Sequence, residues 1–180
     1  MATTKLLTAE DLWEISEPGE HELLRGELRS MPPVGGEHAE IGTNLVTMLW
    51  TFVSARQLGR VYTPDAGFIL ARHPDIVLSP DAAFVREDRL PPREQRRRFL
   101  SLSPDLAVEI LSPSNDPERI SEKAQLYLAH GTQLVWIVDP RTRTVTARSA
   151  SDTAVRHPDD TLDGGVVLPG FRVRVARLFD

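Results

Sequence analysis

The stretch PDLAVEILSPS, residues 104–114, decides the fold. Its apolar residues occupy both faces of an extended chain, which is typical of a central strand that is covered on both sides. Glu109 stands in the middle of this run. An isolated carboxylate removed from water costs several kcal/mol, so a buried acid normally has a partner or a chemical task. The sequence therefore predicts a buried strand that carries a paired or functional acid.

A helix and a second buried strand are predicted after this stretch. Asp116 suits an N-cap, Pro117 a first helical position and Gly131 a C-terminal stop. QLVWIVD, residues 133–139, has the apolar density of another central strand, and the Asp-Pro pair at Asp139 predicts a turn after it. We therefore expect an α/β fold with a mixed central β-sheet flanked by helices, in a single domain that spans residues 1–180.

The N-terminal part of the chain adds two predicted helices and several extended runs. Thr8 with Asp11 resembles a capping box and predicts a short helix over residues 9–16. Apolar residues at helical spacing from Ile41 predict a long amphipathic helix that ends at Gly59. Extended structure, separated by Pro and Gly, is expected for HELLRGELRSMP, RVYT, GFILA, DIVLS, DAAFV, TVTARS and the tail VVLPGFRVRVARLF, with a final turn or helix in the tail.

The amino-acid composition argues against several classes of protein. The net charge is −5, which argues against a protein that coats nucleic acid by bulk charge. No stretch approaches the roughly 20 apolar residues of a membrane span, and the N-terminus lacks the apolar core of a signal peptide. The chain has no cysteine, which excludes disulfides and thiolate chemistry, and a reducing cytoplasm is the expected compartment.

One segment departs from the acidic balance. REDRLPPREQRRR, residues 86–98, holds six arginines and three acids. It is either a solvated loop with a short helix or an edge that faces phosphates, and the run Arg96–Arg98 is its most basic part. The pattern alone does not choose between these interpretations.

A second acid opens another predicted strand. Asp81 begins DAAFV and precedes Glu109 by 28 residues, which is enough for one strand and a return to its neighbour. Two carboxylates that converge at one end of a sheet repel each other unless a cation lies between them. Mg²⁺ characteristically takes one or two carboxylates together with water and substrate phosphate. The alternative is a pair of structural acids bonded to backbone or to arginine.

A lysine on the following helix can reach the same place. On a helical wheel, Ala124 and Tyr127 form the inward stripe, Lys123 falls at its border, and Glu122 points away. A lysine at that position can bury its stem and extend its ammonium toward the end of the sheet. Two acids and one lysine suffice for metal-assisted hydrolysis of a phosphodiester. The alternatives are an exposed helix lysine at 123 and a tyrosine at 127 that only packs.

These motifs resemble a known family. PDAAFV, then PDLAVEILSPS, then SEKAQLYLAHGTQLVWIVDP is similar to the Uma-two family of restriction-endonuclease-like proteins, a branch of the PD-(D/E)xK nuclease superfamily. HELLRGELRSMPP is similar to the early motif of that family, and LPGFRVRVARLF to its ending. The resemblance covers nearly the whole chain and implies a restriction-endonuclease-like fold.

The resemblance also implies roles for individual residues. Asp81 matches the motif aspartate and Glu109 the (D/E) position, while the superfamily lysine would stand at Leu111 and is matched here by Lys123. Glu22 matches the acid of the early motif and is expected either to contact metal or water or to pair with an arginine such as Arg25. His38 precedes the long helix and either touches substrate or caps that helix; we favour the cap.

Other chemistries find no support in the sequence. HELLR begins like a zinc-protease helix, but Arg25 stands where the second histidine belongs. We therefore predict a Mg²⁺- or Mn²⁺-dependent endonuclease that hydrolyses DNA, with Asp81 and Glu109 on the metal, Lys123 assisting the nucleophile, and Glu22 helping. The alternatives are a nucleic-acid-binding module that lost efficient catalysis and a metal hydrolase of a non-nucleic substrate. A homodimer is plausible for a nuclease of this fold.

Overall fold

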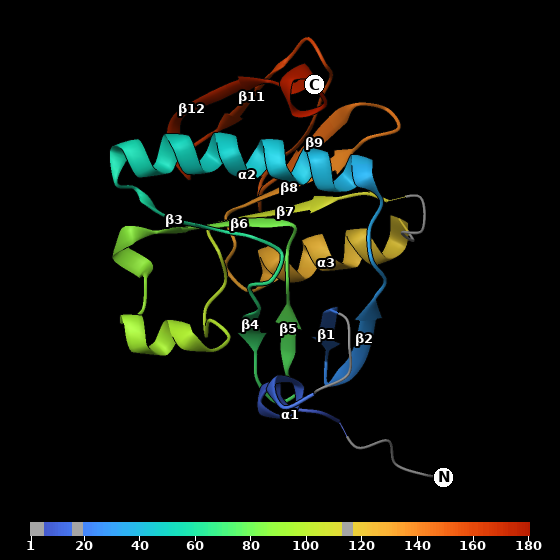
Figure 1. The fold of residues 1–180 in the computed structure, drawn as a ribbon, viewed down its shortest axis with the longest axis vertical. Coiled ribbons are helices and arrows are strands. Elements are labelled where there is room, and N and C mark those ends of the chain that lie inside the picture. The colour runs from blue at the N-terminus through green and yellow to red at the C-terminus, as the bar shows by residue number, and fades with distance from the viewer. Residues whose placement is uncertain (1–5, 16–19, 113–116) are drawn as a thin grey trace.

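The computed structural model describes residues 6–15, 20–112 and 117–180. Within these residues, a mixed β-sheet is covered by one long helix on each face (Figure 1). The helices are α1 (Ala9–Trp13), α2 (Gly36–Arg56) and α3 (Pro117–Ala129), and the short 3₁₀ helices are η1 (Glu87–Arg89), η2 (Arg93–Arg97) and η3 (Val175–Leu178). The prediction of a mixed α/β fold is confirmed.

The central sheet orders its strands β10-β9-β8-β7-β6-β3. β7 pairs parallel with β8 and antiparallel with β6, so the sheet is mixed, as the sequence indicates. Helix α3 makes the crossover between the parallel pair. The strands of this sheet are β3 (Gly59–Tyr62), β6 (Ala82–Arg86), β7 (Leu106–Ile110), β8 (Leu134–Asp139), β9 (Thr144–Arg148) and β10 (Thr153–Arg156).

Strand β7 is buried throughout, which confirms the prediction made from its two apolar faces. Leu106, Val108 and Ile110 pack in one cluster with α2. Ala107 packs on the other face in a cluster with α3. Since successive side chains of a strand alternate between faces, Glu109 points toward α3.

A smaller sheet, ordered β2-β1-β5-β4, lies below the central one (Figure 1). Strands β1 and β2 form a hairpin whose two turn residues, Arg25 and Gly26, have φ angles of 52° and 82°. A turn of this kind matches the twist of a hairpin and accounts for a glycine at its second position. The strands are β1 (Glu20–Leu24), β2 (Glu27–Met31), β4 (Phe68–Ala71) and β5 (Ile76–Leu78).

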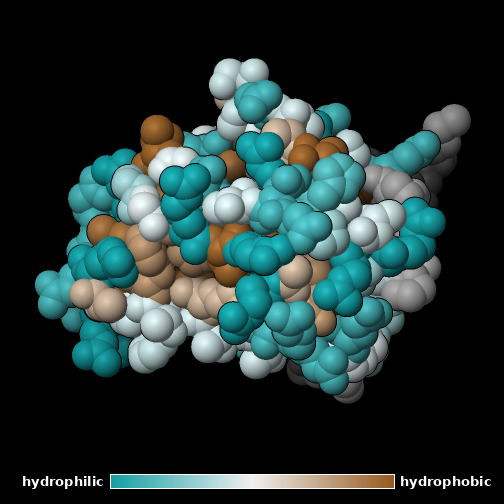
Figure 2. Space-filling model, turned by 90° about the horizontal axis from the view of Figure 1, so that it is seen from above, coloured by the Kyte–Doolittle hydropathy of each residue, from teal (hydrophilic) through white to brown (hydrophobic). Residues whose placement is uncertain are grey.

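A third, two-stranded sheet near the C-terminus covers α2 from above. It consists of β11 (Thr161–Gly164) and β12 (Leu168–Arg174), and η3 follows it, so the predicted strand and final helix of the tail are confirmed. From this side the surface is mostly hydrophilic, with a band of apolar residues across its centre (Figure 2).

Some helix boundaries differ from their predictions. The capping box of Thr8 and Asp11 is present, but α1 is shorter than expected and ends at Trp13. Helix α2 ends before Gly59, because Gln57 takes the left-handed conformation at its C-terminus with φ 53°. The predicted N-cap at Asp116 lies outside the described residues.

The C-terminal stop of α3 and the turn after β8 are as predicted. Gly131 has a φ of 101° and its amide donates to the Leu128 carbonyl oxygen, closing the last turn. Asp139 accepts hydrogen bonds from the amides of Arg141 and Thr142. Among the described residues, no helix combines the length and apolar character that crossing a bilayer requires.

Candidate active site

Asp81 and Glu109 lie on neighbouring strands, as the sequence predicts. β6 and β7 pair antiparallel with Ala82 opposite Val108, so Asp81, just before β6, faces the C-terminal end of β7. The amide of Ile110 donates to Asp81 Oδ2 over 2.6 Å. The backbone of the residue after Glu109 therefore fixes the Asp81 carboxylate, and both acids lie at the same end of the sheet.

The Glu109 side chain is buried between β7 and α3, and both of its oxygens are bonded. It is 3% exposed. The Lys123 ammonium donates to this carboxylate over 2.8 Å, and the Tyr127 hydroxyl donates to Oε1 over 3.0 Å. The acid in the middle of a buried strand thus has two donors from the helix that covers it. Tyr127, expected only to pack, is also a hydrogen-bond partner.

The Lys123 ammonium lies between two carboxylates. It is 2.9 Å from Glu22 Oε1 and 2.8 Å from Glu109, and the whole residue is 3% exposed. The prediction that this lysine buries its stem and reaches the end of the sheet is confirmed, and an exposed helix lysine is excluded. Glu122, the preceding residue, points away as expected and pairs with Arg25 over 2.7 Å.

Glu22 joins the cluster from β1 of the smaller sheet. It is 2% exposed, and the Ser79 amide donates to its Oε1 over 2.9 Å. Of the expected arginine partners, Arg25 is wrong because it faces Glu122; Glu22 pairs most closely with Lys123 and more loosely with another arginine. Arg119 lies farther off, 3.9 Å from Glu22 Oε2.

Burial governs the protonation of this cluster. Burial raises the pKa of Glu109 to about 7; the nearby charges of Asp81 and Glu22 add to the rise and Lys123 opposes it. Burial alone would lower the pKa of Lys123, but the two glutamates outweigh it and raise the pKa. Burial and the same glutamates hold the pKa of Tyr127 well above its ordinary value. Lys123 therefore stays a cation and Tyr127 a hydrogen-bond donor.

His38, in the first turn of α2, contacts this end of β7. Its Nε2 is 3.0 Å from the Ile110 carbonyl oxygen and 3.4 Å from Asp81 Oδ2. Burial would lower the pKa of His38, but the hydrogen bond and charge of Asp81 outweigh it and raise the pKa. The expected cap is wrong: the N-cap of α2 is Gly35, and the His38 ring instead faces Asp81 and β7.

A hollow of about 400 Å³ opens beside Asp81 and His38, between α2 and the residues after β3. Its walls include Val46, Thr63 and Pro64. Asp81 is partly exposed, whereas the carboxylates around Lys123 are closed from solvent. A substrate can therefore approach the acid pair from the Asp81 side.

The donor atoms at this end of the sheet fit a hard divalent cation. Asp81 and Glu109 supply carboxylate oxygens and the Ile110 carbonyl supplies a third oxygen, while His38 donates its Nε2–H to that carbonyl. Oxygen ligands of these kinds suit Mg²⁺ and Mn²⁺. Within residues 6–15, 20–112 and 117–180, no three His, Cys, Asp or Glu side chains are arranged around one point as a metal site. Lys123 instead compensates Glu109 and Glu22.

Comparison with known proteins gives the family. The model of the Uma2 family, described as "Putative restriction endonuclease", matches residues 9–176. The chain belongs to the Uma2 family. Its fold is similar to that of a solved structure from Anabaena variabilis ATCC 29413, described as "a putative nuclease belonging to DUF820", with a TM-score of 0.85 at 22% identity over 96% of this chain and 97% of that chain. A search of curated proteins gave no match.

Position 111, where the superfamily pattern predicts a lysine, holds Leu111 in this chain. Residues 109 and 111 share a face of an extended chain, so a lysine at Leu111 would project on the side of Glu109. In this Uma2 chain, Lys123 supplies an ammonium on that side from α3 instead. Sequence reasoning missed the carbonyl of Ile110 and the hydroxyl of Tyr127, because neither residue type signals its hydrogen bond.

Proposed function

We propose that this protein is an endonuclease that hydrolyses DNA phosphodiester bonds with Mg²⁺ or Mn²⁺. Membership of a family described as restriction endonucleases supports a nucleic-acid substrate. The observation that carries the proposal is the buried lysine between two carboxylates, with a third acid hydrogen-bonded beside them. Burying these charged groups costs free energy, so the cluster is expected where a site needs it for chemistry rather than for stability.

Asp81 and Glu109 are the residues that would hold the metal, with the Ile110 carbonyl oxygen next to them. When bound, the metal would supply Lewis-acid polarisation of the phosphate and a more acidic water. The Ile110 amide keeps the Asp81 carboxylate in place, and His38 limits its movement on the other side. The site is therefore largely organised before any ligand arrives, which lowers the cost of binding.

Lys123 assists the nucleophile in this proposal. Its ammonium would orient the attacking water or stabilise the negative charge that develops on the phosphate. Glu22 and Tyr127 act through others: Glu22 holds Lys123, and Tyr127 holds Glu109. We assign Glu22 as a positioning residue, and direct contact of Glu22 with metal or water stays a prediction.

The test is cleavage of plasmid and single-stranded DNA with Mg²⁺ or Mn²⁺. Asp81→Ala and Glu109→Ala, together with the isosteric Asp81→Asn and Glu109→Gln, should each abolish cleavage. Glu40→Gln, which changes an exposed acid of α2, is the matched control and should cleave like the unmodified protein. DNA cleavage that survives the substitutions of Asp81 and Glu109 would refute the proposal.

One observation favours a second candidate, a DNA-binding module without efficient catalysis. Lys123 already pairs with both buried glutamates, so each carboxylate has a cationic partner without a metal. The same assay separates the two: retention of DNA without cleavage, unchanged by either acid substitution, would indicate the binding module. The homodimer stays a prediction, which light scattering of the purified protein tests.

A further inference from the structure

The arginine-rich segment, residues 86–98, divides into one half whose arginines pair with acids and a second half whose arginines do not. Arg86 pairs with Asp88 through two contacts of 3.0 and 2.6 Å, and Arg89 pairs with the buried Asp105 over 2.8 Å. Both arginines therefore have an acidic partner, and Arg89 fixes the segment against Asp105, just before β7. The half that contains η2 and ends at Arg98 is different.

In residues 93–98, most of the positive charge is uncompensated. Arg96 donates from Nε to the Pro91 carbonyl oxygen over 2.6 Å. Arg93, Arg97 and Arg98 are exposed and have no acidic partner in the part of the chain that the structure describes. This half therefore carries a cationic surface that the fold does not use.

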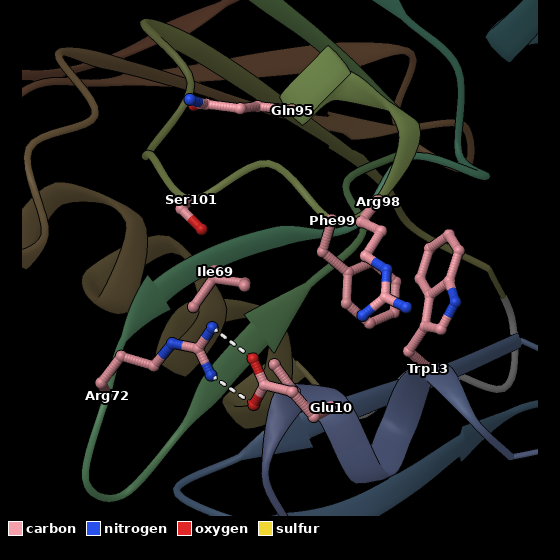
Figure 3. Close-up of a pocket in the computed structure, with 9 residues that line it drawn as sticks. Glu10, Trp13, Ile69, Arg72, Gln95, Arg98, Phe99 and Ser101 are labelled. Carbon is pink, nitrogen blue, oxygen red and sulfur yellow. Dashed lines mark hydrogen bonds and ion pairs between the residues drawn. The ribbon is translucent and has the colours of Figure 1, made fainter. Parts of the chain in front are cut away.

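A hollow of about 320 Å³ lies directly against this surface, between α1, β4 and the end of the arginine-rich segment (Figure 3). Trp13 and Phe99 form an aromatic wall, with ring centroids 5.0 Å apart and ring planes at 84°. The Arg98 guanidinium lies 5.7 Å from the Trp13 ring. Trp13 nevertheless stays 41% exposed, which leaves part of its ring open for contact with another planar group.

The acid in the hollow is already neutralised. Glu10 receives two hydrogen bonds from Arg72, of 2.8 and 2.9 Å (Figure 3). The same guanidinium also donates to the buried Asp75. Arg72 therefore has no spare charge, whereas Arg98 does. Gln95 adds an amide that can both donate and accept hydrogen bonds at the edge of the hollow.

An aromatic wall, an amide and a free guanidinium are the groups that bind an unstacked nucleobase and its phosphate. The volume is at the lower end of the range for ligand pockets, so the hollow suits one small planar group. A base in a duplex is already paired and stacked, so only a single strand presents one freely. We infer that this hollow binds a base of a single-stranded nucleic acid, with Arg97 and Arg98 on the adjoining phosphates.

The position of the hollow relates it to the candidate active site. Strand β5 runs upward from the end near α1 toward β6 (Figure 1). In the chain, Asp75 directly precedes β5 and Asp81 follows it. They are six residues apart, which corresponds to at most about 20 Å of extended chain. The inference rests on the proposed nuclease function and adds to it a subsite for an unpaired part of the substrate, away from the acid pair.

The test measures binding of a fluorescent oligothymidine by anisotropy in EDTA, so that the strand stays intact. Trp13→Ala should weaken binding at least about fivefold, since a base stacked on an aromatic ring contributes about that much or more. Arg98→Ala should weaken binding and lower the salt slope by roughly 0.7, the value for one phosphate of a single strand. Trp13→Phe should keep most of the affinity.

Matched controls come from similar residues elsewhere. Trp50→Ala removes a tryptophan of α2 that is 60% exposed, and Arg177→Ala removes an exposed arginine paired with Asp180. Both should leave affinity unchanged, and thermal melts should show that all variants are folded. Unchanged affinity in folded Trp13→Ala and Arg98→Ala proteins would overturn the inference, as would equal losses for a duplex of the same sequence.

Parallel cleavage assays with Mg²⁺ or Mn²⁺ separate this inference from the nuclease proposal. If the unmodified protein cleaves DNA and the Trp13 and Arg98 variants bind it normally, the subsite is refuted and the nuclease stands. If those variants lose affinity but the unmodified protein never cleaves, the subsite stands and the nuclease proposal is refuted.

Discussion

Replacing Lys123 with methionine tests the buried cluster most severely. The substitution keeps the apolar stem but removes the ammonium that lies 2.9 Å from Glu22 and 2.8 Å from Glu109. Glu109 then loses its cation and Glu22 is left with Arg119, 3.9 Å from its Oε2, while each glutamate is at most 3% exposed. Removing one partner of a buried ion pair typically costs about 3–5 kcal/mol. We expect a loss in that range in the free energy of unfolding of the metal-free protein.

The assay is urea denaturation in EDTA at neutral pH, followed by circular dichroism. Adding Glu109→Gln to Lys123→Met should recover at least about 1.5 kcal/mol, because a glutamine at position 109 needs neither a cation nor a bound proton in the buried site. Arg25→Met, which breaks the exposed pair with Glu122 near the same helix, is the control and should cost no more than about 1 kcal/mol. A loss below about 1 kcal/mol for Lys123→Met would refute the reasoning.

Three further predictions concern other contacts. Tyr127→Phe should cost about 1–2 kcal/mol in urea denaturation, because Glu109 Oε1 loses its hydroxyl donor, and no measurable loss would contradict that hydrogen bond. Burial would raise the pKa of Asp75, but hydrogen bonds from the amides of Ala9 and His73 and from Arg72 outweigh it and lower the pKa. Asp75→Asn should therefore cost about 2–3 kcal/mol at neutral pH, with the difference shrinking as pH falls below the ordinary aspartate pKa; a pH-independent difference would contradict this. Gly59→Ala should lower the melting temperature strongly, at a cost of about 3 kcal/mol or more, since the added Cβ would collide with the Val85 carbonyl oxygen; an unchanged melting temperature would contradict the packing.

The strands and the acids were predictable from the sequence because burial on two faces leaves a strong pattern. Leu106 to Ile110 are apolar except for Glu109, and this interruption indicated the candidate site. The wheel of α3 placed Lys123 at the border of the inward stripe, and the structure directs its ammonium to Glu109, since helical spacing fixes which residues can reach the sheet. Strands β10 and β11 were missed because each has only four residues, too few for a clear alternation of apolar and polar side chains.

The contacts that the sequence did not reveal depend on elements far apart in the chain. Tyr127 in an apolar stripe predicts packing, and its hydroxyl gains a role only because β7 turns Glu109 toward α3. His38 at the start of a helix resembles a cap, yet its ring meets Ile110 across the sheet. Helix α2 ends at Gln57 without a glycine, so the glycine rule misplaced its end.

The central claim is that Asp81 and Glu109 together hold a divalent cation. Its most direct test is the anomalous scattering of manganese in crystals grown with Mn²⁺. We expect a manganese peak within coordination distance of both carboxylates, lost in crystals of Glu109→Gln. A peak that contacts neither acid, or none at all while Lys123 still joins Glu22 to Glu109, would contradict it.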